Sequence, residues 1–140
     1  MKAGEINSLF KNLSKIIKNP RSDLKYKNKF TLLVSVVLSA QCTDVNVNNV
    51  TRNIYPKYNK PEHFVRLGRK KIEKLIKSIG LFRNKAKSVY LLSKQLIEKH
   101  NKKVPKNFDD LCALPGVGKK TASVVLNEIW RNKLSFQKPK

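Results

Sequence analysis

Apolar residues recur every three to four positions along most of this chain, and that spacing restricts its fold more than any other feature. The period matches one face of an α-helix, whereas a half-buried strand would alternate apolar and polar residues. Alternating runs and the glycine dipeptides that close tight hairpins are absent from the sequence. The pattern therefore predicts an all-α fold.

The apolar stripes predict a series of helices. One stripe runs over residues 6–17 and ends at Asn19-Pro20. Residues 30–38 are apolar nearly all round, as in a buried central helix, with a buried strand as the alternative. Further stripes cover residues 45–58, 62–67, 72–79 and 86–97.

Local signals place several helix ends. Pro61 is a favourable first helical residue, and Gly80 is expected to stop the helix over 72–79. Asn107 is a candidate N-cap for a short helix to residue 113, with two aspartates in its first turn. The last helix is predicted to begin near Lys119.

The charge favours a polyanionic partner. The formal net charge is +22, which points to nucleic acid, although the excess of lysine, asparagine and isoleucine also fits the codon bias of an AT-rich genome. A 40% hydrophobic content and 140 residues suit one globular domain with its own core. No signal peptide or membrane span is recognisable, so we expect a soluble protein of a bacterial-type cytoplasm, associated with the nucleoid.

The two cysteines, Cys42 and Cys112, lie far apart and match no metal or redox spacing. Their apolar surroundings predict buried structural thiols, and no metal site is expected.

The stretch LPGVGKKTASVVLN, residues 114–127, carries the clearest chemical signal. Gly116 and Gly118 can adopt positive φ and let a ligand approach the backbone, next to the free amides of the following helix. Such a nest of amides binds anions, and a DNA phosphate suits this charge. An ordinary turn between two antiparallel helices is the alternative.

This stretch resembles the helix-hairpin-helix motif of the endonuclease III family of DNA glycosylases. LLVSVVLSAQCTDVNVN (32–48), IKSIGLFRNKAKSV (76–89) and HNKKVP (100–105) resemble that family in the same order, over roughly residues 6–130. The resemblance implies a helix-hairpin-helix glycosylase six-helix barrel at 22–130, with the motif at about 108–127. It implies that 1–21 belong to a second domain and leaves 131–140 as a tail without family likeness.

The resemblance implies that a damaged base is flipped out of duplex DNA and that Lys120 attacks the sugar to form a Schiff base. A lysine buried at a helix N-terminus among other cations has a physical reason to lose its proton. A solvated lysine at the helix end is the alternative. Lys119 is expected to contact phosphate or solvent, and Lys120 favours the branch that removes oxidised pyrimidines.

The resemblance also implies DNA contacts. Gln41 would fill the gap left by the flipped nucleotide, and Leu81 would be an intercalating wedge, unless it is a hydrophobic C-cap contact after Gly80. Asp44 is expected to cap the helix after Thr43, near the pocket. The remaining expected DNA contacts are Leu114, Pro115, Gly116, Val117, Gly118, Lys119 and Thr121.

The C-terminal part departs from the family. The family carries a catalytic aspartate in a VDTH-like segment and a four-cysteine [4Fe–4S] loop, whereas no aspartate follows Asp110 and no such cysteines occur here. The sequence therefore predicts no bindable cofactor and the loss of most of the second, iron–sulfur domain, as in a fragment or a frameshifted product.

The expected function is base-excision repair: an N-glycosylase for oxidised pyrimidines with abasic-site lyase activity, impaired and with more lyase than glycosylase activity. The expected partner is double-stranded DNA with a damaged base or abasic site, bound by a monomer. The alternatives are a non-catalytic helix-hairpin-helix DNA-binding module and an unstable remnant. A general nucleoid or ribosomal protein would leave the buried stripes unexplained.

Overall fold

The computed structural model describes residues 24–131 and shows seven α-helices and no strand within that range. The predicted stripe over 6–17 and the tail after Arg131 lie outside these residues, so the predicted division into 1–21, 22–130 and 131–140 stays a prediction. The all-α prediction is confirmed. The helices are α2 (Lys29–Leu38), α3 (Asp44–Thr51), α4 (Pro61–Leu67), α5 (Arg69–Leu75), α6 (Phe82–Lys99), α7 (Phe108–Cys112) and α8 (Lys119–Arg131).

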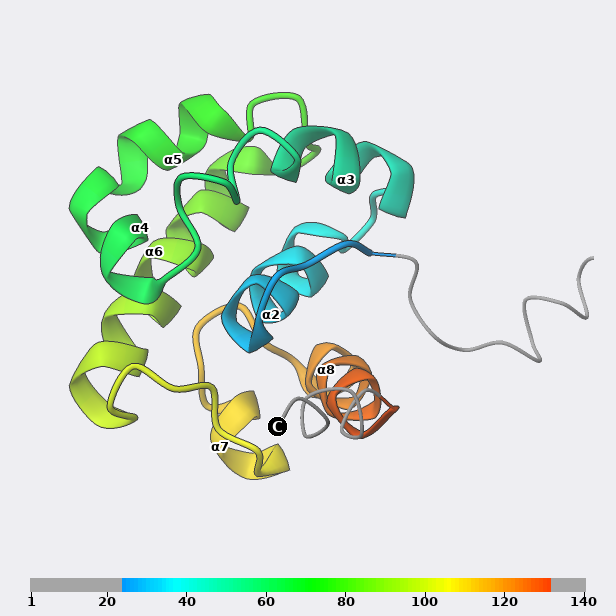
Figure 1. The fold of residues 1–140 in the computed structure, drawn as a ribbon, viewed down its shortest axis with the longest axis vertical. Coiled ribbons are helices and arrows are strands. Elements are labelled where there is room, and N and C mark those ends of the chain that lie inside the picture. Colours follow the sequence, from blue (N-terminus) through cyan, green and yellow to red (C-terminus); the bar gives the residue numbers. More distant parts are fainter. Residues whose placement is uncertain (1–23, 132–140) are drawn as a thin grey trace, which may run out of the picture.

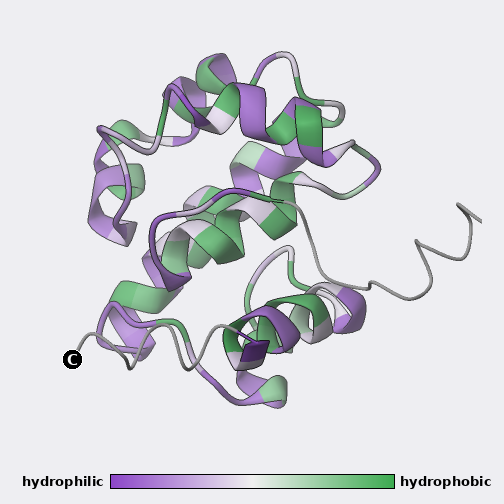
Figure 2. Cartoon of the chain, turned by 45° about the vertical axis from the view of Figure 1, so that its right-hand side comes forward, coloured by the Kyte–Doolittle hydropathy of each residue, from purple (hydrophilic) through white to green (hydrophobic). Residues whose placement is uncertain are grey.

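Helix α2 is the centre of the fold. Every residue after Lys29 in this helix is buried, which explains its unbroken apolar sequence and excludes the strand alternative. Asn28 and Thr31 form a capping box at its half-buried start, so the backbone amides of these two residues are paired. Figure 2 shows α2 as the most hydrophobic element, surrounded by helices with polar outer faces.

Five of the other helices form two groups around α2, and α3 packs against α2 itself. Helices α4, α5 and α6 pack against one another, and α7 packs against α8. Helix α2 contacts α6 in the first group and α8 in the second, and it lies between the two in Figure 1. The candidate site lies where the C-terminal end of α2 meets the N-terminal end of α8.

The local signals for three helix starts are confirmed. Pro61 is the first residue of α4, and α8 begins at Lys119. The Asn107 side chain accepts a hydrogen bond from the Asp110 amide and so caps α7.

Two helices end earlier than the stripes predicted. Helix α3 ends at Thr51, although Ile54 further along is buried, and α5 ends at Leu75, although Ile76 and Ile79 are buried. Hydrogen-bonded turns continue beyond both ends, as in the bonds from Ile54 N to Thr51 O and from Ile79 N to Ile76 O. Successive turns keep nearly the helical spacing, so the apolar period does not reveal where the helix stops.

Candidate nucleic-acid interface

The LPGVG stretch forms a tight turn between α7 and α8. The Val117 amide donates to the Leu114 carbonyl at 3.1 Å, and Gly116 has a φ of 78°. A glycine with positive φ at the third position is what a type II turn requires, and proline is common at its second position. The Leu114 and Val117 side chains are buried and anchor the turn, so only their backbone can face a ligand.

The two glycines of this turn have different roles. A Cβ on Gly116 would come within 2.5 Å of the Ser88 Oγ in α6, so both the backbone conformation and the close packing require glycine there. Gly118 does not have positive φ, and a Cβ there would meet no atom within 4 Å. Gly118 therefore does not use the positive φ that a glycine can adopt, and the space beside it is open to a ligand.

The start of α8 presents backbone donors next to this open space. The Ala122 amide donates to the Gly118 carbonyl at 2.9 Å, and the amides of residues 119–121 precede the first intrahelical bond. These donors and the helix dipole favour an anion. The Lys119 and Lys120 side chains are exposed, so the expected burial of Lys120 is wrong for the described chain.

A pocket of about 460 Å³ brings the central candidate residues together. Its lining includes Gln41 and Asp44 from the segment after α2, and Lys120 and Thr121 from the first turn of α8. Almost eighty positions separate these segments in the sequence, so their meeting is a property of the fold. The pocket joins an amide, a carboxylate and an amine around one space.

The turn that carries Gln41 has an unusual backbone. Gln41 has a φ of 57° and an exposed side chain, directly after the end of α2. The Thr43 side chain accepts from the Asn46 amide at 3.1 Å and caps α3. Asp44 is the first residue of that helix rather than its cap, which corrects the expectation.

Leu81 has the same backbone conformation in a second turn. It has a φ of 60° and ψ of 32° at the N-cap position of α6, and its side chain is 54% exposed. A C-cap contact after Gly80 does not describe it, because α5 ends at Leu75 and the side chain is not packed away. An L-residue in this left-handed region is strained by roughly 1–2 kcal/mol.

One face of α6 contacts all three turns, and sequence reasoning missed it. The Leu81 carbonyl accepts from the Lys85 amide at 3.0 Å, and the Lys85 Nζ donates to the Ala40 carbonyl at 2.6 Å. Ser88 lies against Gly116. Residues 81, 85 and 88 follow the i, i+4, i+7 spacing of a single helix face.

Lys85 is unusual for a lysine because it is only 5% exposed. Burial lowers its pKa, and the charge of an ionised Cys42 nearby would oppose that shift. Its amine fixes the residue immediately before Gln41, so it is a positioning group for that turn.

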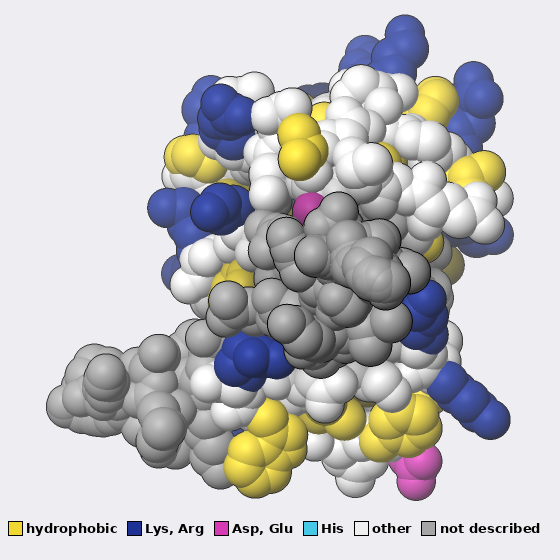
Figure 3. All heavy atoms as spheres, turned by 90° about the vertical axis from the view of Figure 1, so that its right-hand side faces the viewer, with side chains coloured by type: hydrophobic (Ala, Val, Ile, Leu, Met, Phe, Trp, Pro, Cys, Tyr) yellow, Lys and Arg dark blue, Asp and Glu magenta, His cyan; other side chains and the backbone are white. Residues whose placement is uncertain are grey.

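Basic side chains are not confined to this interface. Figure 3 shows dark blue lysine and arginine side chains at several separate places on one side of the molecule, with few acidic groups. Charge alone therefore does not locate a DNA site, and the turns and the pocket do so more specifically.

Comparison with known proteins identifies the family. The family described as HhH-GPD superfamily base excision DNA repair protein matches residues 34–133. The chain belongs to this family. Endonuclease III of Rickettsia prowazekii (strain Madrid E) is 49% identical over 91% of this chain and 60% of its own length. Endonuclease III of Bacillus subtilis (strain 168) is 49% identical over 75% of this chain and 48% of its own.

Solved structures of the HhH-GPD family agree with this fold. A trapped endonuclease III–DNA covalent intermediate, an estranged-adenine complex, matches with a TM-score of 0.76 and 41% identity over 91% of this chain and 60% of that one. The predicted resemblance to endonuclease III and the predicted helix-hairpin-helix fold are confirmed. The chain spans about 60% of the length of the first of these relatives.

The iron–sulfur cluster that the family resemblance implies does not fit the described residues. Cys42 and Cys112 are free and half-buried rather than fully buried as expected. Within residues 24–131, no three or more His, Cys, Asp or Glu side chains gather where they could hold a metal. In the same range, no helix has the length and apolar character needed to cross a membrane.

Proposed function

We propose that this chain acts in DNA base-excision repair as an endonuclease III-like N-glycosylase for oxidised pyrimidines with abasic-site lyase activity. The proposed substrate is double-stranded DNA with a damaged base or an abasic site, bound by a monomer. The observation that carries the proposal is the pocket shared by Gln41, Asp44 and Lys120 beside the LPGVG turn.

The turn and the start of α8 supply the grip on DNA in this proposal. Backbone amides at Gly118 and Lys119 would bind a phosphate beside the lesion, with the exposed Lys119 amine adding charge. Leu81 would enter the base stack as an apolar wedge, and Gln41 would occupy the space of the flipped nucleotide. Pro115 in the turn and Thr121 in the first turn of α8 would also contact the DNA in this proposal.

Lys120 carries the covalent step. At an abasic site its neutral amine adds to C1′ of the open sugar, and loss of water gives a protonated Schiff base. A water molecule acting as base then takes a C2′ proton, and the electron pair of that C–H bond forms a C2′=C3′ double bond. The C3′–O bond breaks, and the 3′ phosphate leaves with its electron pair. Asp44 lines the same pocket, and a carboxylate there stabilises the positive charge of the iminium.

Base excision makes a further demand, because the departing base has to be protonated or otherwise stabilised. No aspartate follows Asp110 in these 140 residues, whereas the resemblance implies a catalytic one downstream of the motif. We therefore expect these 140 residues to process a ready-made abasic site better than a damaged base.

Borohydride trapping on a duplex with one abasic site tests the proposal. Borohydride reduces the Schiff base to a stable amine, so the protein becomes covalently bound to the DNA. We expect trapping with the unaltered chain and with Lys119→Ala, and none with Lys120→Ala. Equal trapping in Lys120→Ala would contradict the assignment of the nucleophile.

A second candidate function is a non-catalytic DNA-binding module. The exposure of Lys120 favours it, because an exposed lysine at the start of a helix can contact a DNA phosphate without any covalent step. Folded protein that binds the duplex but gives no trapped product would support this function.

A further inference from the structure

A second pocket, of about 720 Å³, lies at the other end of α2. Lys29, the first residue of α2, lines it, whereas Val36 near the opposite end of the helix lines the candidate site. A ten-residue helix is about 15 Å long, so the two pockets are separate places on the molecule. The turn before α4 and the loop after α6 complete the wall.

Lysine is concentrated around this pocket beyond what the composition requires. Among the described residues that line it, six of twelve are lysines, whereas lysine and arginine together account for 31 of the 140 residues of the chain. The candidate site has a single lysine in its lining. The members of this lysine pocket are Lys27, Lys29, Lys60, Lys102, Lys103 and Lys106.

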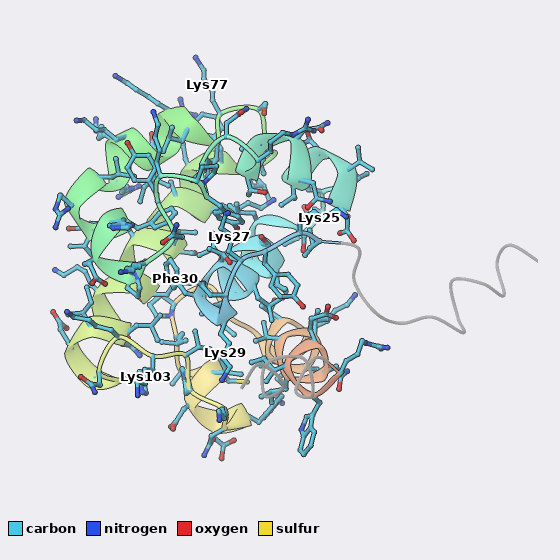
Figure 4. All side chains as sticks on the ribbon, in the orientation of Figure 1. Lys25, Lys27, Lys29, Phe30, Lys77 and Lys103 are labelled. Atoms are coloured by element: carbon cyan, nitrogen blue, oxygen red, sulfur yellow. The ribbon has the colours of Figure 1, made fainter. Side chains whose placement is uncertain are left out.

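These lysines come from three segments that the fold brings together. Figure 4 shows Lys27 and Lys29 on the segment that opens α2, and Lys103 on the loop after α6. Lys60 immediately precedes α4. A run of lysines on one helix face usually points into solvent. Here the lysines come from distant parts of the chain and line the same pocket, so their charges act on the same space.

The positive charge of the lysine pocket is poorly balanced. Within residues 24–131, Glu62 is the one acidic residue in its lining, and the Glu62 Oε2 lies 3.7 Å from the Lys102 Nζ. Burial lowers the pKa of Lys29, and the charges of Lys106 and Lys103 lower it further. Like charges held this close repel one another, and a bound anion would remove the repulsion.

We propose that the lysine pocket binds a compact anion with two or more phosphate groups, independently of the DNA-binding face. Its volume lies within the range of about 300–1,000 Å³ typical of small-molecule sites, so a compact polyphosphate fits inside it. Lysines supply ammonium donors around such a group, and several phosphates are needed to match several lysines. The Asn28 side chain already accepts a hydrogen bond from the Thr31 amide at the start of α2. The helix N-terminus is therefore not the main anion-binding group, and the lysine side chains provide the binding.

Calorimetric titration of the full 140-residue chain with sodium tripolyphosphate, at ionic strength held constant with sodium chloride, tests this site. The pocket variant is Lys29→Gln with Lys106→Gln. The matched control is Lys70→Gln with Lys71→Gln, which removes the same charge from two exposed positions of α5. We expect the pocket variant to bind at least about tenfold more weakly and the control within about twofold of the unaltered chain.

The melting temperature without ligand adds an independent readout. Removing repelling charges should leave the pocket variant at least as stable as the unaltered chain. A lower melting temperature would show that these lysines stabilise the fold instead. Equal loss of tripolyphosphate binding in both double variants would show that binding depends only on the net charge of the chain. Either result would overturn the proposal, as would sulfate binding as tightly as tripolyphosphate.

A lesion-free duplex separates a free polyphosphate from a nucleic-acid backbone. If the site is independent, a saturating duplex leaves tripolyphosphate affinity unchanged, and Lys120→Ala does the same. If the duplex displaces tripolyphosphate and the pocket variant weakens duplex binding more than the control does, the pocket holds DNA backbone and the proposal is wrong. Borohydride trapping in the pocket variant stays intact in the expected case, so failure here is distinguishable from failure of the repair function.

Discussion

The LPGVG turn and the two turns at Gln41 and Leu81 solve the same backbone problem in opposite ways. Each contains a residue with φ between 57° and 78°. The LPGVG turn places glycine there, which adopts this conformation without strain. The other two turns place residues with long side chains at the strained position, and both side chains are exposed.

The difference shows that packing of the fold requires the glycine in the LPGVG turn, whereas the residues at the other two turns are not explained by packing. Gly116 lies against Ser88, so no side chain would fit. At Gln41 and Leu81 the side chains point away from the core, and a glycine would relieve strain of roughly 1–2 kcal/mol. Strained residues of this kind cluster where a ligand is bound, which supports a DNA-contacting role for both.

The largest effect that tests this comparison is on stability at Gly116. Gly116→Ala combines a left-handed backbone with overlap against Ser88, so we expect a loss of about 2–4 kcal/mol in the free energy of unfolding. Gly118→Ala is the matched control, because its Cβ meets nothing within 4 Å, and it should change stability by less than about 1 kcal/mol. Urea denaturation followed by circular dichroism measures both, and equal losses would contradict the different roles of the two glycines.

The second effect concerns DNA affinity at Gly118. The added methyl group of Gly118→Ala would occupy the open space that the proposed phosphate contact needs at the start of α8, so we expect about tenfold weaker binding to an abasic duplex. Fluorescence anisotropy at fixed salt measures it. Unchanged affinity in a normally folded Gly118→Ala variant would show that phosphate does not approach the backbone there.

The sequence predicted those parts of the fold that depend on local chemistry. Pro61 and Asn107 mark helix starts because capping and the missing proline donor act within a few residues. The start of α8 at Lys119 follows the glycine turn directly. The ends of α3 and α5 were not predictable, because Ile54 and Ile79 continue the apolar period inside turns.

The sequence predicted the motif residues of the candidate site, but not the residues that hold those segments in position. LPGVGKK and the Gln41 and Leu81 segments are visible in the sequence, and the pocket that joins Gln41 to Lys120 agrees with them. Lys85 gave no signal, because a helical lysine is usually exposed and its partner is the Ala40 carbonyl 45 positions away. For Lys120 the sequence left burial and a solvated helix end as alternatives, and only the tertiary packing decides that the side chain is exposed.

The third effect is at Lys85, which links the strained Leu81 and Gln41 turns. Lys85→Met keeps most of the side-chain volume but removes the bond to Ala40, so the Gln41 turn should lose its fixed position. We expect about fivefold slower borohydride trapping, with stability at neutral pH changed by about 1 kcal/mol or less. Unchanged trapping would show that Lys85 does not position the Gln41 turn.

The stability of this variant should also depend on pH in a defined direction. Because the pKa of Lys85 is lowered in the folded chain from its ordinary 10.5, the unfolded chain binds more protons between the folded value and 10.5. The unaltered chain should therefore gain stability relative to Lys85→Met as pH rises through that window towards 10.5. Parallel denaturation curves at several pH values measure this difference, and a constant difference would contradict a lowered pKa.

The smallest effect is at the two strained side chains. Leu81→Gly and Gln41→Gly relieve left-handed strain but add freedom to the unfolded chain, so the net change in stability should lie within about 1 kcal/mol of zero. Leu81→Ala keeps the strain and removes the wedge, and because the side chain is exposed its stability should also change little. All three variants should nevertheless bind an abasic duplex more weakly, since the lost groups are those that would enter the base stack. If the glycine variants unfold more easily by several kcal/mol, these residues serve the fold as Gly116 does, and the contrast between the turns disappears.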